Sequence, residues 1–385
     1  MTEQESYIVL NMLNGIGPAR MNILKSRYGS AGNILNASAE DLAALPGVGK
    51  VLGEKIANWE KYVDLAGELL LAEKGGVKIV TLADEEEYPY ILRELRDAPL
   101  CLYIRGDLPP DIGERSLGIV GTRSMSHYGS RMAKHLSEAA AYSHFTVISG
   151  LAYGVDACAH HAVLDAGGKT VSVLGGGLAR IQPQDHVPLA REIVEKGGAV
   201  ISEFPMETNP TRHTFPMRNR IISGLSTGVL VVEAGLNSGS LITANFALEQ
   251  NRTLFAVPGH ADDPGAAGCN SLIRQGAVLV ECFDHILEEF EFLPGFTSGR
   301  NMIREEKSSY MATPVSIKDG HTENDPEKDE SEKLLAVLQK EKTASLETLA
   351  EKSGLAAGTI SSLLIMLELE HRIQRLDSGL YRLKI

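Results

Sequence analysis

Small and hydroxyl-bearing residues recur at turns that could bind phosphate groups. They follow short β-branched stretches and form the turns at residues 121–124, 149–154, 175–177 and 238–243. Glycine lets the backbone approach an anion closely, and a helix that begins after such a turn directs N–H groups toward it. Several of these turns in one chain predict that several phosphates in a row are bound, rather than one.

A basic segment with an aromatic ring could supply the matching positive charge. Residues 212–222 hold three arginines and one phenylalanine. A guanidinium binds phosphate through two hydrogen bonds, and a phenyl ring offers a face on which a base can stack. We therefore predict a basic groove suited to single-stranded nucleic acid, formed by Arg123, Lys169, Arg212, Phe215, Arg218 and Arg220.

Other interpretations of these residues remain open. Phe215 could belong to the core while one or two arginines pair with Glu203 or Glu233. A Rossmann-type nucleotide-binding or nucleotide-hydrolysing enzyme would use Asp156, His160, His161 and either Glu203 or Glu233. However, the chain has neither the Gly-x-Gly-x-x-Gly pattern of dinucleotide folds nor a Walker-type phosphate loop, and it shows no nucleophile–base pair. We therefore expect a binding protein, not an enzyme, without a metal site.

Strands and helices alternate through the middle of the chain and would position these turns. Five β-branched apolar runs lie at residues 117–120, 145–148, 170–174, 228–232 and 253–257, with helical stretches such as 131–142 and 241–250 between them. Such alternation predicts an α/β fold with a doubly wound, Rossmann-like parallel sheet. Ligands of an open α/β sheet bind beyond the carboxyl ends of its strands, where the turns above occur.

The two ends of the chain predict smaller domains. Two Gly-apolar-Gly turns, at 15–17 and 47–49, indicate a helix-hairpin-helix or SAM-like helical domain. Three helical stretches and an alternating hairpin indicate a C-terminal winged helix. Because no Lys or Arg lies between Leu355 and Glu370, we expect that domain to contact protein or to have a structural role, rather than to read duplex DNA. The predicted domains are 1–75 (helical), 80–295 (Rossmann-like), 296–333 (flexible linker) and 334–385 (winged helix).

Composition restricts where such a protein works. The net charge of −13 is unusual for a nucleic-acid binder, but net charge says little about one face of a molecule. Four widely spaced cysteines indicate neither a zinc site nor a disulfide framework. The sequence shows neither a signal peptide nor an apolar stretch long enough for a membrane helix. We therefore expect a cytoplasmic protein with no membrane span.

These motifs resemble those of the DNA-processing protein A family, also called DprA or Smf. The resemblance covers about residues 88–280 and rests on IVGTR (119–123), SGLA (149–152), GVD (154–156), FPMRNR (215–220), VEA (232–234), SGSLIT (238–243), AVPG (256–259) and GCNSLI (268–273). One departure is the run Ile181-Gln182-Pro183, where the family usually has a Tyr-Pro pair.

The resemblance implies a protein of natural transformation that binds and protects incoming single-stranded DNA. Such proteins load the RecA recombinase, displace single-strand-binding protein, and act as homodimers without a cofactor. By motif position, the phosphate path is implied to include Arg123, Ser149, Gly150, Lys169, Arg218, Arg220, Ser238, Gly239 and Ser240. Gly121, Thr122, Arg212, Phe215 and Asn219 complete the predicted DNA-binding set.

Overall fold

The computed structural model describes residues 1–290 completely and residues 333–383 in part. In the second range it describes 337–341, 343–353, 372–375 and 380–383, together with several single residues. The chain forms two units, Met1–Arg304 and Glu305–Ile385, and each is described here by itself. Of the predicted flexible linker, residues 296–332 lie outside the described part of the chain.

The chain begins with a group of short helices in which glycines form the turns. These helices are α1 (Glu3–Met12), α2 (Pro18–Tyr28), α3 (Ala31–Leu35), α4 (Ala39–Ala43), α5 (Gly49–Ala57) and α6 (Leu65–Lys74). The two predicted hairpin turns precede α2 and α5. Gly15, Gly47 and Gly49 adopt positive φ there (104°, 78° and 69°), a conformation that residues other than glycine rarely adopt.

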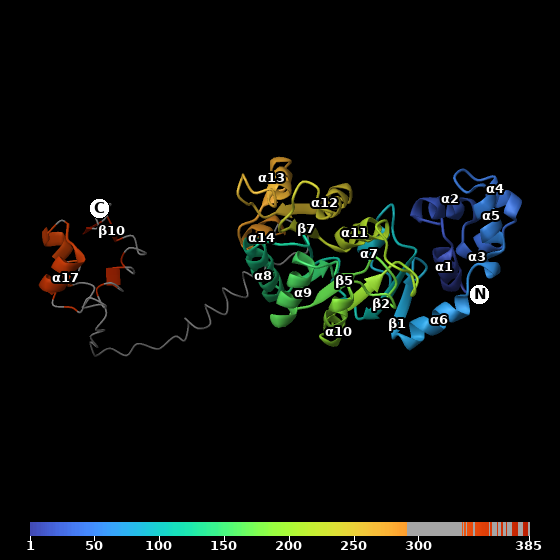
Figure 1. Ribbon diagram of the computed structural model, residues 1–385, viewed down its shortest axis with the longest axis horizontal. Helices are drawn as coiled ribbons and strands as arrows, with labels where there is room; N and C mark the ends of the chain where they lie inside the picture. The colour runs from blue at the N-terminus through green and yellow to red at the C-terminus, as the bar shows by residue number, and fades with distance from the viewer. Residues whose placement is uncertain are drawn as a thin grey trace, which may run out of the picture. The chain divides into compact units, whose positions relative to one another are not determined.

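Nine strands in residues 1–290 form one sheet, which runs through the centre of this unit (Figure 1). They are β1 (Val77–Thr81), β2 (Cys101–Gly106), β3 (Ser116–Val120), β4 (Thr146–Ser149), β5 (Thr170–Val173), β6 (Ala199–Ser202), β7 (Gly228–Val231), β8 (Thr253–Ala256) and β9 (Val278–Leu279). Their spatial order is β1-β2-β6-β5-β4-β3-β7-β8-β9. Strands β3 to β9 pair with one another in parallel, whereas β2 pairs antiparallel with β6 and β1 pairs antiparallel with β2 at that edge.

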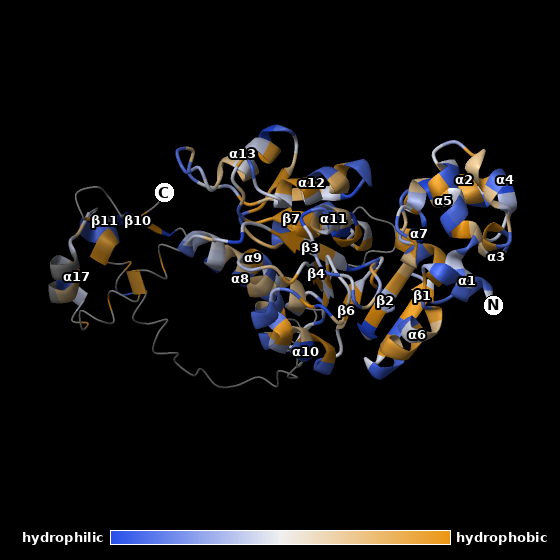
Figure 2. Ribbon diagram, turned by 45° about the vertical axis from the view of Figure 1, so that its right-hand side comes forward, coloured by the Kyte–Doolittle hydropathy of each residue, from blue (hydrophilic) through white to orange (hydrophobic). Residues whose placement is uncertain are grey.

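Helices cover both faces of the sheet, so the predicted doubly wound fold is confirmed. One face packs against α8 (His127–Tyr142), α9 (Val155–Asp165) and α14 (Asp284–Phe290). The other packs against α7 (Tyr90–Arg93), α11 (Thr214–Leu225), α12 (Ser240–Glu249) and α13 (Ala267–Arg274). Helix α10 (Val187–Glu195) lies against β5, β6 and α9. The central strands β3 to β7 are buried at every position and mostly apolar, and Figure 2 shows the sheet largely in orange.

The strand order reverses between β3 and β7, because the chain winds outward from β3 in one direction through β6 and returns to β7 on its other side. Connections that leave on opposite faces of the sheet leave a crevice at such a point, beyond the carboxyl ends of the strands. The turns after β3 and β7 border that crevice, and they contain two of the predicted phosphate-binding motifs.

The C-terminal unit contains α17 (Leu346–Ser353) and a hairpin of β10 (Ile373–Arg375) and β11 (Tyr381–Leu383). The hairpin pairs Ile373 with Leu383, which confirms the alternating pattern expected at this end. Apolar residues that include Leu338, Leu349 and Leu364 form its core. No helix among the described residues of either unit is both long and apolar enough to cross a membrane.

Candidate functional site

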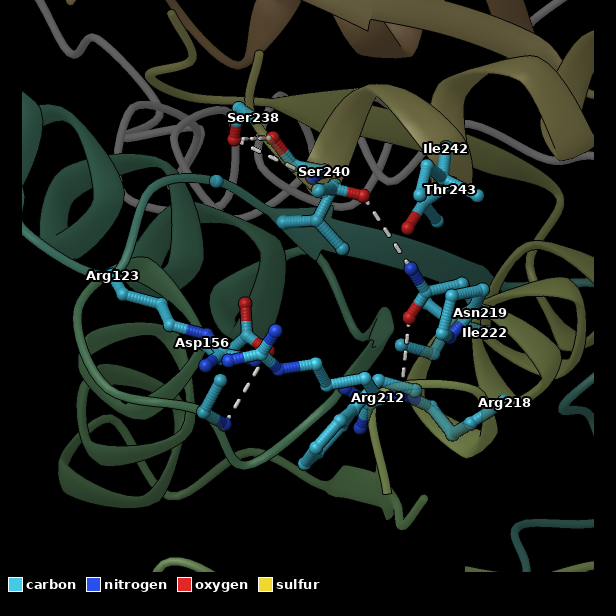
Figure 3. Close-up of a pocket in the computed structure, with 16 residues that line it drawn as sticks. Arg123, Asp156, Arg212, Arg218, Asn219, Ile222, Ser238, Ser240, Ile242 and Thr243 are labelled. Carbon is cyan, nitrogen blue, oxygen red and sulfur yellow. Dashed lines mark hydrogen bonds between the residues drawn. The ribbon is translucent and has the colours of Figure 1, made fainter. Parts of the chain in front are cut away.

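A cavity of about 350 Å³ lies where the strand order reverses, beyond β3 and β7 (Figure 3). Three of its charged lining residues are arginines and one is an aspartate. They are Arg123, Arg212, Arg218 and Asp156, and the remaining wall includes Gly121, Phe215, Asn219, Ser238, Gly239 and Ser240. The sequence-predicted residues therefore meet here from four separate segments. The cavity carries a positive formal charge in a strongly acidic chain.

Arg123 and Phe215 form the rim of the cavity. The Arg123 guanidinium lies 5.3 Å from the centre of the Phe215 ring, in a cation–π contact between the turn after β3 and the start of α11. Arg123 is exposed, and it makes no ion pair within the described part of the chain. Its charge is thus held in place by the ring and remains open to a ligand.

The turn that carries Arg123 is fixed by β7. The Thr122 amide donates to the Glu233 carbonyl at 2.7 Å, and the Ser126 amide and hydroxyl donate to the Glu233 carboxylate. Gly121 packs so closely that an added Cβ would overlap Val155. Gly121, Thr122 and Glu233 therefore position Arg123. Glu233 forms no ion pair with the predicted arginines.

Arg218 is part of the buried floor, with only 4% of its surface exposed. Its Nη1 donates to the carbonyls of Gly150 (2.6 Å) and Val173, and its Nε donates to Asn219 at 3.1 Å. Burial lowers the pKa of Arg218 to about 10. The negative charge of Asp156 opposes this shift, and the positive charge of Arg123 reinforces it. The guanidinium remains charged at neutral pH and ties α11 to the ends of β4 and β5.

Asp156 occupies the turn that the sequence assigns to a phosphate. Its buried carboxylate accepts from the amides of Gly150 (3.2 Å) and Ala152 (3.4 Å). Burial raises the pKa of this carboxyl group, while Arg218 and the backbone amides oppose the shift. The anion bound by this turn is thus the chain's own side chain, and these amides are not free for a ligand.

The Ser238–Gly239–Ser240 turn, in contrast, faces the cavity with donors to offer. The Ser238 and Ser240 hydroxyls lie 2.8 Å apart, and α12 begins directly after Gly239 without a side-chain cap. Asn219 holds the turn against α11 by donating to the Gly239 carbonyl at 3.5 Å. The amides of Ser240, Leu241 and Ile242 already donate to Ser238 and Gly239. The Gly239 amide and the serine hydroxyls are the donors that the start of this ten-residue helix can offer to an anion.

Thr122 and Gly150 do not line this cavity, although they adjoin residues that do, and three other predicted residues lie away from it. The Ser149 hydroxyl is buried and donates to the Ile119 carbonyl at 2.6 Å. Lys169 is exposed but precedes β5, so it lies at the amino edge of the sheet, opposite the cavity. The predicted groove that combined Lys169 with Arg123 is therefore wrong.

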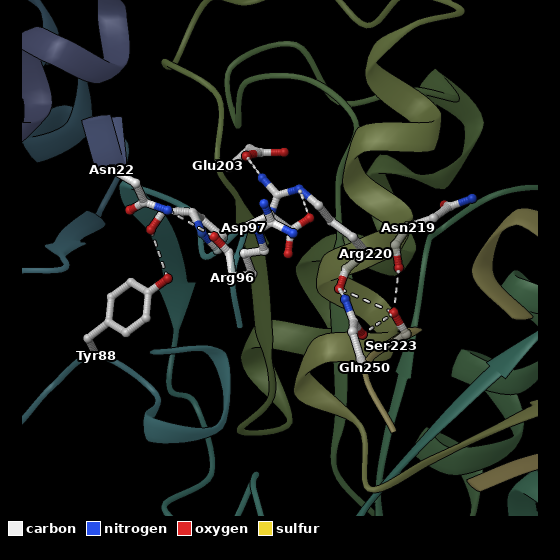
Figure 4. A network of polar contacts seen from close by, with 10 residues as sticks. Asn22, Tyr88, Arg96, Asp97, Glu203, Asn219, Arg220, Ser223 and Gln250 are labelled. Atoms are coloured by element: carbon white, nitrogen blue, oxygen red, sulfur yellow. Dashed lines mark hydrogen bonds and ion pairs between the residues drawn. The ribbon is translucent and has the colours of Figure 1, made fainter. Parts of the chain in front are cut away.

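Arg220 is the third, and it points away from the cavity. It is 5% exposed, pairs with the buried carboxylate of Glu203, and lies 3.7 Å from Asp97 (Figure 4). Residues two apart on an α-helix point in nearly opposite directions, so Arg218 and Arg220 cannot face one groove. The alternative in which an arginine pairs with Glu203 describes Arg220 correctly.

The side chains that the enzyme alternative would use for hydrolysis are either separated from one another or already hydrogen-bonded within the fold. His160 is fully buried, its Nδ1 lies 2.7 Å from the Thr170 hydroxyl, and burial lowers its pKa to about 3, so it stays neutral. His161 is exposed on the same helix, and Asp156 is bound by its own turn. No group of three His, Cys, Asp or Glu side chains that could hold a metal occurs among the described residues.

The sequence analysis missed a smaller cavity of about 160 Å³ beside the first. It shares Arg123, Ala152 and Phe215 with the first cavity and adds Tyr153, Gln182 and Pro183. The departure from the Tyr-Pro pair was the only sequence signal that pointed to this loop. Its proximity to Arg123 depends on the fold, because two strands and two helices separate Gln182 from Arg123 in the sequence.

Comparison with known proteins places this site in a family. The model of DNA recombination-mediator protein A matches residues 78–291, which hold the whole sheet and the cavity. A SAM-like helix-hairpin-helix tandem matches residues 8–58, and a DprA winged helix domain matches residues 321–379. The predicted fold class is thereby confirmed, including both accessory domains.

Individual relatives agree with this result. Protein Smf of Escherichia coli is 40% identical over 306 residues, which are 78% of this chain and 76% of that protein. DNA processing protein DprA of Bacillus subtilis is 41% identical over 59% of this chain and 76% of its own length. The X-ray structure of DNA processing protein A from Streptococcus pneumoniae is 31% identical, with a TM-score of 0.63, and the match covers 76% of this chain and 99% of that one.

Removal of the Arg218 side chain should destabilise the fold. Arg218→Ala leaves two buried carbonyls without a donor and Asp156 without its neighbouring cation, so we expect the free energy of unfolding to fall by about 3 kcal/mol. Thermal and urea unfolding would measure this loss. The matched control is Arg212→Ala in the same cavity, which removes an exposed arginine and should change stability by less than about 0.5 kcal/mol. Equal stability of the two variants would contradict the buried role of Arg218.

Arg220 should behave as half of a buried ion pair. We expect Arg220→Ala to lower the free energy of unfolding by about 3–5 kcal/mol, because it leaves Glu203 buried and unpaired. Arg220→Met combined with Glu203→Leu should restore most of that loss, which the same unfolding measurements would reveal. If Arg220→Ala left stability unchanged and weakened DNA binding instead, Arg220 would be a phosphate contact, as the family resemblance implied.

Proposed function

The chain belongs to the DNA recombination-mediator protein A family, and on that premise we propose that its cavity binds single-stranded DNA. The observation that carries the proposal is the exposed Arg123 guanidinium held over the Phe215 ring, beside the serine hydroxyls and the Gly239 amide at the start of α12. In the complex, Arg123 and Arg212 bind phosphates from the rim. Ser238, Gly239 and Ser240 bind a further phosphate through hydroxyl and amide donors.

Access to Phe215 favours an unpaired strand. The ring is half-buried between Arg123 and the cavity wall, so a base contacts it only after it has unstacked from the neighbouring bases. In a duplex, the base pair must be broken before such contact, which costs free energy, whereas in a single strand no pair has to be broken. Phosphate contacts together with stacking give affinity without sequence preference, because every base has an aromatic face.

In the cell, this binding would serve recombination during natural transformation. The protein would protect an incoming strand in the cytoplasm, displace single-strand-binding protein, and load RecA, acting as a homodimer without a cofactor. The family description as a recombination mediator supports this role. The C-terminal winged helix would contact protein rather than DNA, in keeping with the lack of basic residues between Leu355 and Glu370.

The protein would act by binding rather than by catalysis. Asp156 and Glu233, the carboxylates nearest the cavity, accept hydrogen bonds that fix two turns, and His160 is buried and neutral. None of the three is placed to activate water or a nucleophile. We expect no turnover of nucleotides or DNA by the purified protein. Product formation that is lost in an Asp156→Asn or Glu233→Gln variant of retained fold would establish the enzyme alternative.

Competition binding would test the proposed function directly. A single-stranded oligonucleotide should displace a labelled strand at much lower concentration than a duplex of equal length. Arg123→Ala should weaken single-strand binding by roughly 1.5–3 kcal/mol at low salt and flatten the slope of log affinity against log salt by about 0.7. Arg123→Lys should recover part of the loss, because it keeps the charge without the planar fork.

The control for this variant is Arg131→Ala, which removes an exposed arginine of α8 that lies outside the cavity. It should leave both the affinity and the salt slope close to those of the unaltered protein. Equal affinity for duplex and single strand, or an Arg123→Ala variant with unchanged binding, would overturn the proposed site.

The C-terminal unit should be dispensable for strand binding. A chain that ends at Pro294 keeps the cavity and should retain most of its affinity for a single strand in the same titration. A loss of more than tenfold, or ~1.4 kcal/mol, would move part of the DNA site onto the winged helix.

A further inference from the structure

We propose that a second basic cavity, lined by Arg105, Arg180 and Arg191, binds further phosphates of the same DNA strand. This inference rests on the proposed function, since it extends the path of the strand beyond the first cavity. The second cavity has a volume of about 800 Å³ and lies between β2, the loop at residues 178–184 and α10. Glu195 is the only acidic residue that lines it.

Two of its arginines are close enough to repel each other. Burial and the charge of Arg191 both lower the pKa of Arg105, which is half-buried and donates to the Gly75 carbonyl at 2.9 Å. Neither residue makes an ion pair within the described part of the chain. Like charges that share a cavity are unfavourable in the free protein. A phosphate between them would remove that repulsion.

Arg180 adds a third charge at the exposed side of the same cavity. It pairs with Glu207 at 3.1 Å, and both side chains are more than half exposed (51% and 60%). An exposed pair of this kind is weak, so a phosphate can compete for the Arg180 guanidinium. The cavity thus combines two unpaired guanidinium groups with one that is held loosely.

The small cavity shares lining residues with both the first and the second cavity. That small cavity shares Arg123 and Phe215 with the first and Gln182 with the second. A strand whose phosphate binds Arg123 can therefore cross the loop of Gln182 and Pro183 and reach Arg191. The loop at residues 178–184 supplies lining residues to both of these cavities.

The distribution of charge among the cavities supports this path. Both the first and the second cavity have three arginines and one acidic residue in their walls. A cavity of about 560 Å³ beside the first hairpin turn has Glu68, Glu203 and Glu207 in its wall and no basic residue. In a chain with 50 acidic and 37 basic residues, the two basic cavities lie next to each other. A polyanion that spans both is the ligand that fits this arrangement.

Oligonucleotide length distinguishes the two cavities. We would titrate oligothymidylates of about 4 to about 16 nucleotides, the range of site sizes of single-strand-binding folds. Arg191→Ala should weaken binding of the long oligonucleotides about three- to tenfold and flatten their salt slope by about 0.7, while the shortest bind as before. Arg191 is exposed and unpaired, so its removal should leave thermal stability unchanged. Arg131→Ala again serves as the matched control.

Each outcome of this experiment decides one question. If Arg191→Ala and Arg191→Glu bind long strands with unchanged affinity and salt slope, the second cavity is not on the path, and the proposal for the first cavity is unaffected. "Unchanged" here means within the spread of the Arg131→Ala control. If Arg123→Ala binds oligonucleotides of every length normally, the proposed function itself fails. A loss that is equal for all lengths in Arg191→Ala would place Arg191 in the first site and would overturn a separate second one.

Discussion

The buried guanidinium of Arg218 holds the floor of the cavity together. It joins α11 to the carbonyls at the ends of β4 and β5, and it faces the carboxylate that orders the turn after β4. Burial of a charge is costly unless hydrogen bonds and an opposite charge compensate for it, and here both do. Because three segments meet at this one group, the positions of α11, which carries Phe215, and of the turn after β4 depend on it.

The charges of the site therefore divide between internal and external roles. The Asp156 carboxylate accepts hydrogen bonds from the amides of its own turn, and Glu233 fixes the turn of Arg123. Glu203 neutralises Arg220. These pairs make the walls rigid before any ligand arrives, and rigid walls reduce the ordering cost of binding. What remains unpaired is at the rim: Arg123, Arg212 and the turn that begins α12. Affinity for a polyanion depends on these groups.

The sequence predicted the sheet better than the orientation of single side chains. Continuous β-branched runs identified five of the parallel strands, whereas β6 has only two β-branched residues, between Ala199 and Ser202, and did not stand out. The opposite directions of Arg218 and Arg220 follow from their spacing on one helix, and the place of Lys169 follows from its position before a strand. Asp156 was different: that it binds the turn instead of a phosphate depends on amide directions, which no residue pattern reveals.

An acidic protein can bind a polyanion when its basic side chains are clustered and its acidic side chains lie elsewhere or are paired within the fold. At a Debye length of about 8–10 Å in physiological salt, a phosphate in the cavity is governed by the nearest charges rather than by the net charge of −13. Those nearest charges are arginines in a three-to-one excess over acids. The surrounding negative surface then has a function of its own. It opposes binding of DNA away from the clustered arginines, so a strand gains by lying in the basic cavities.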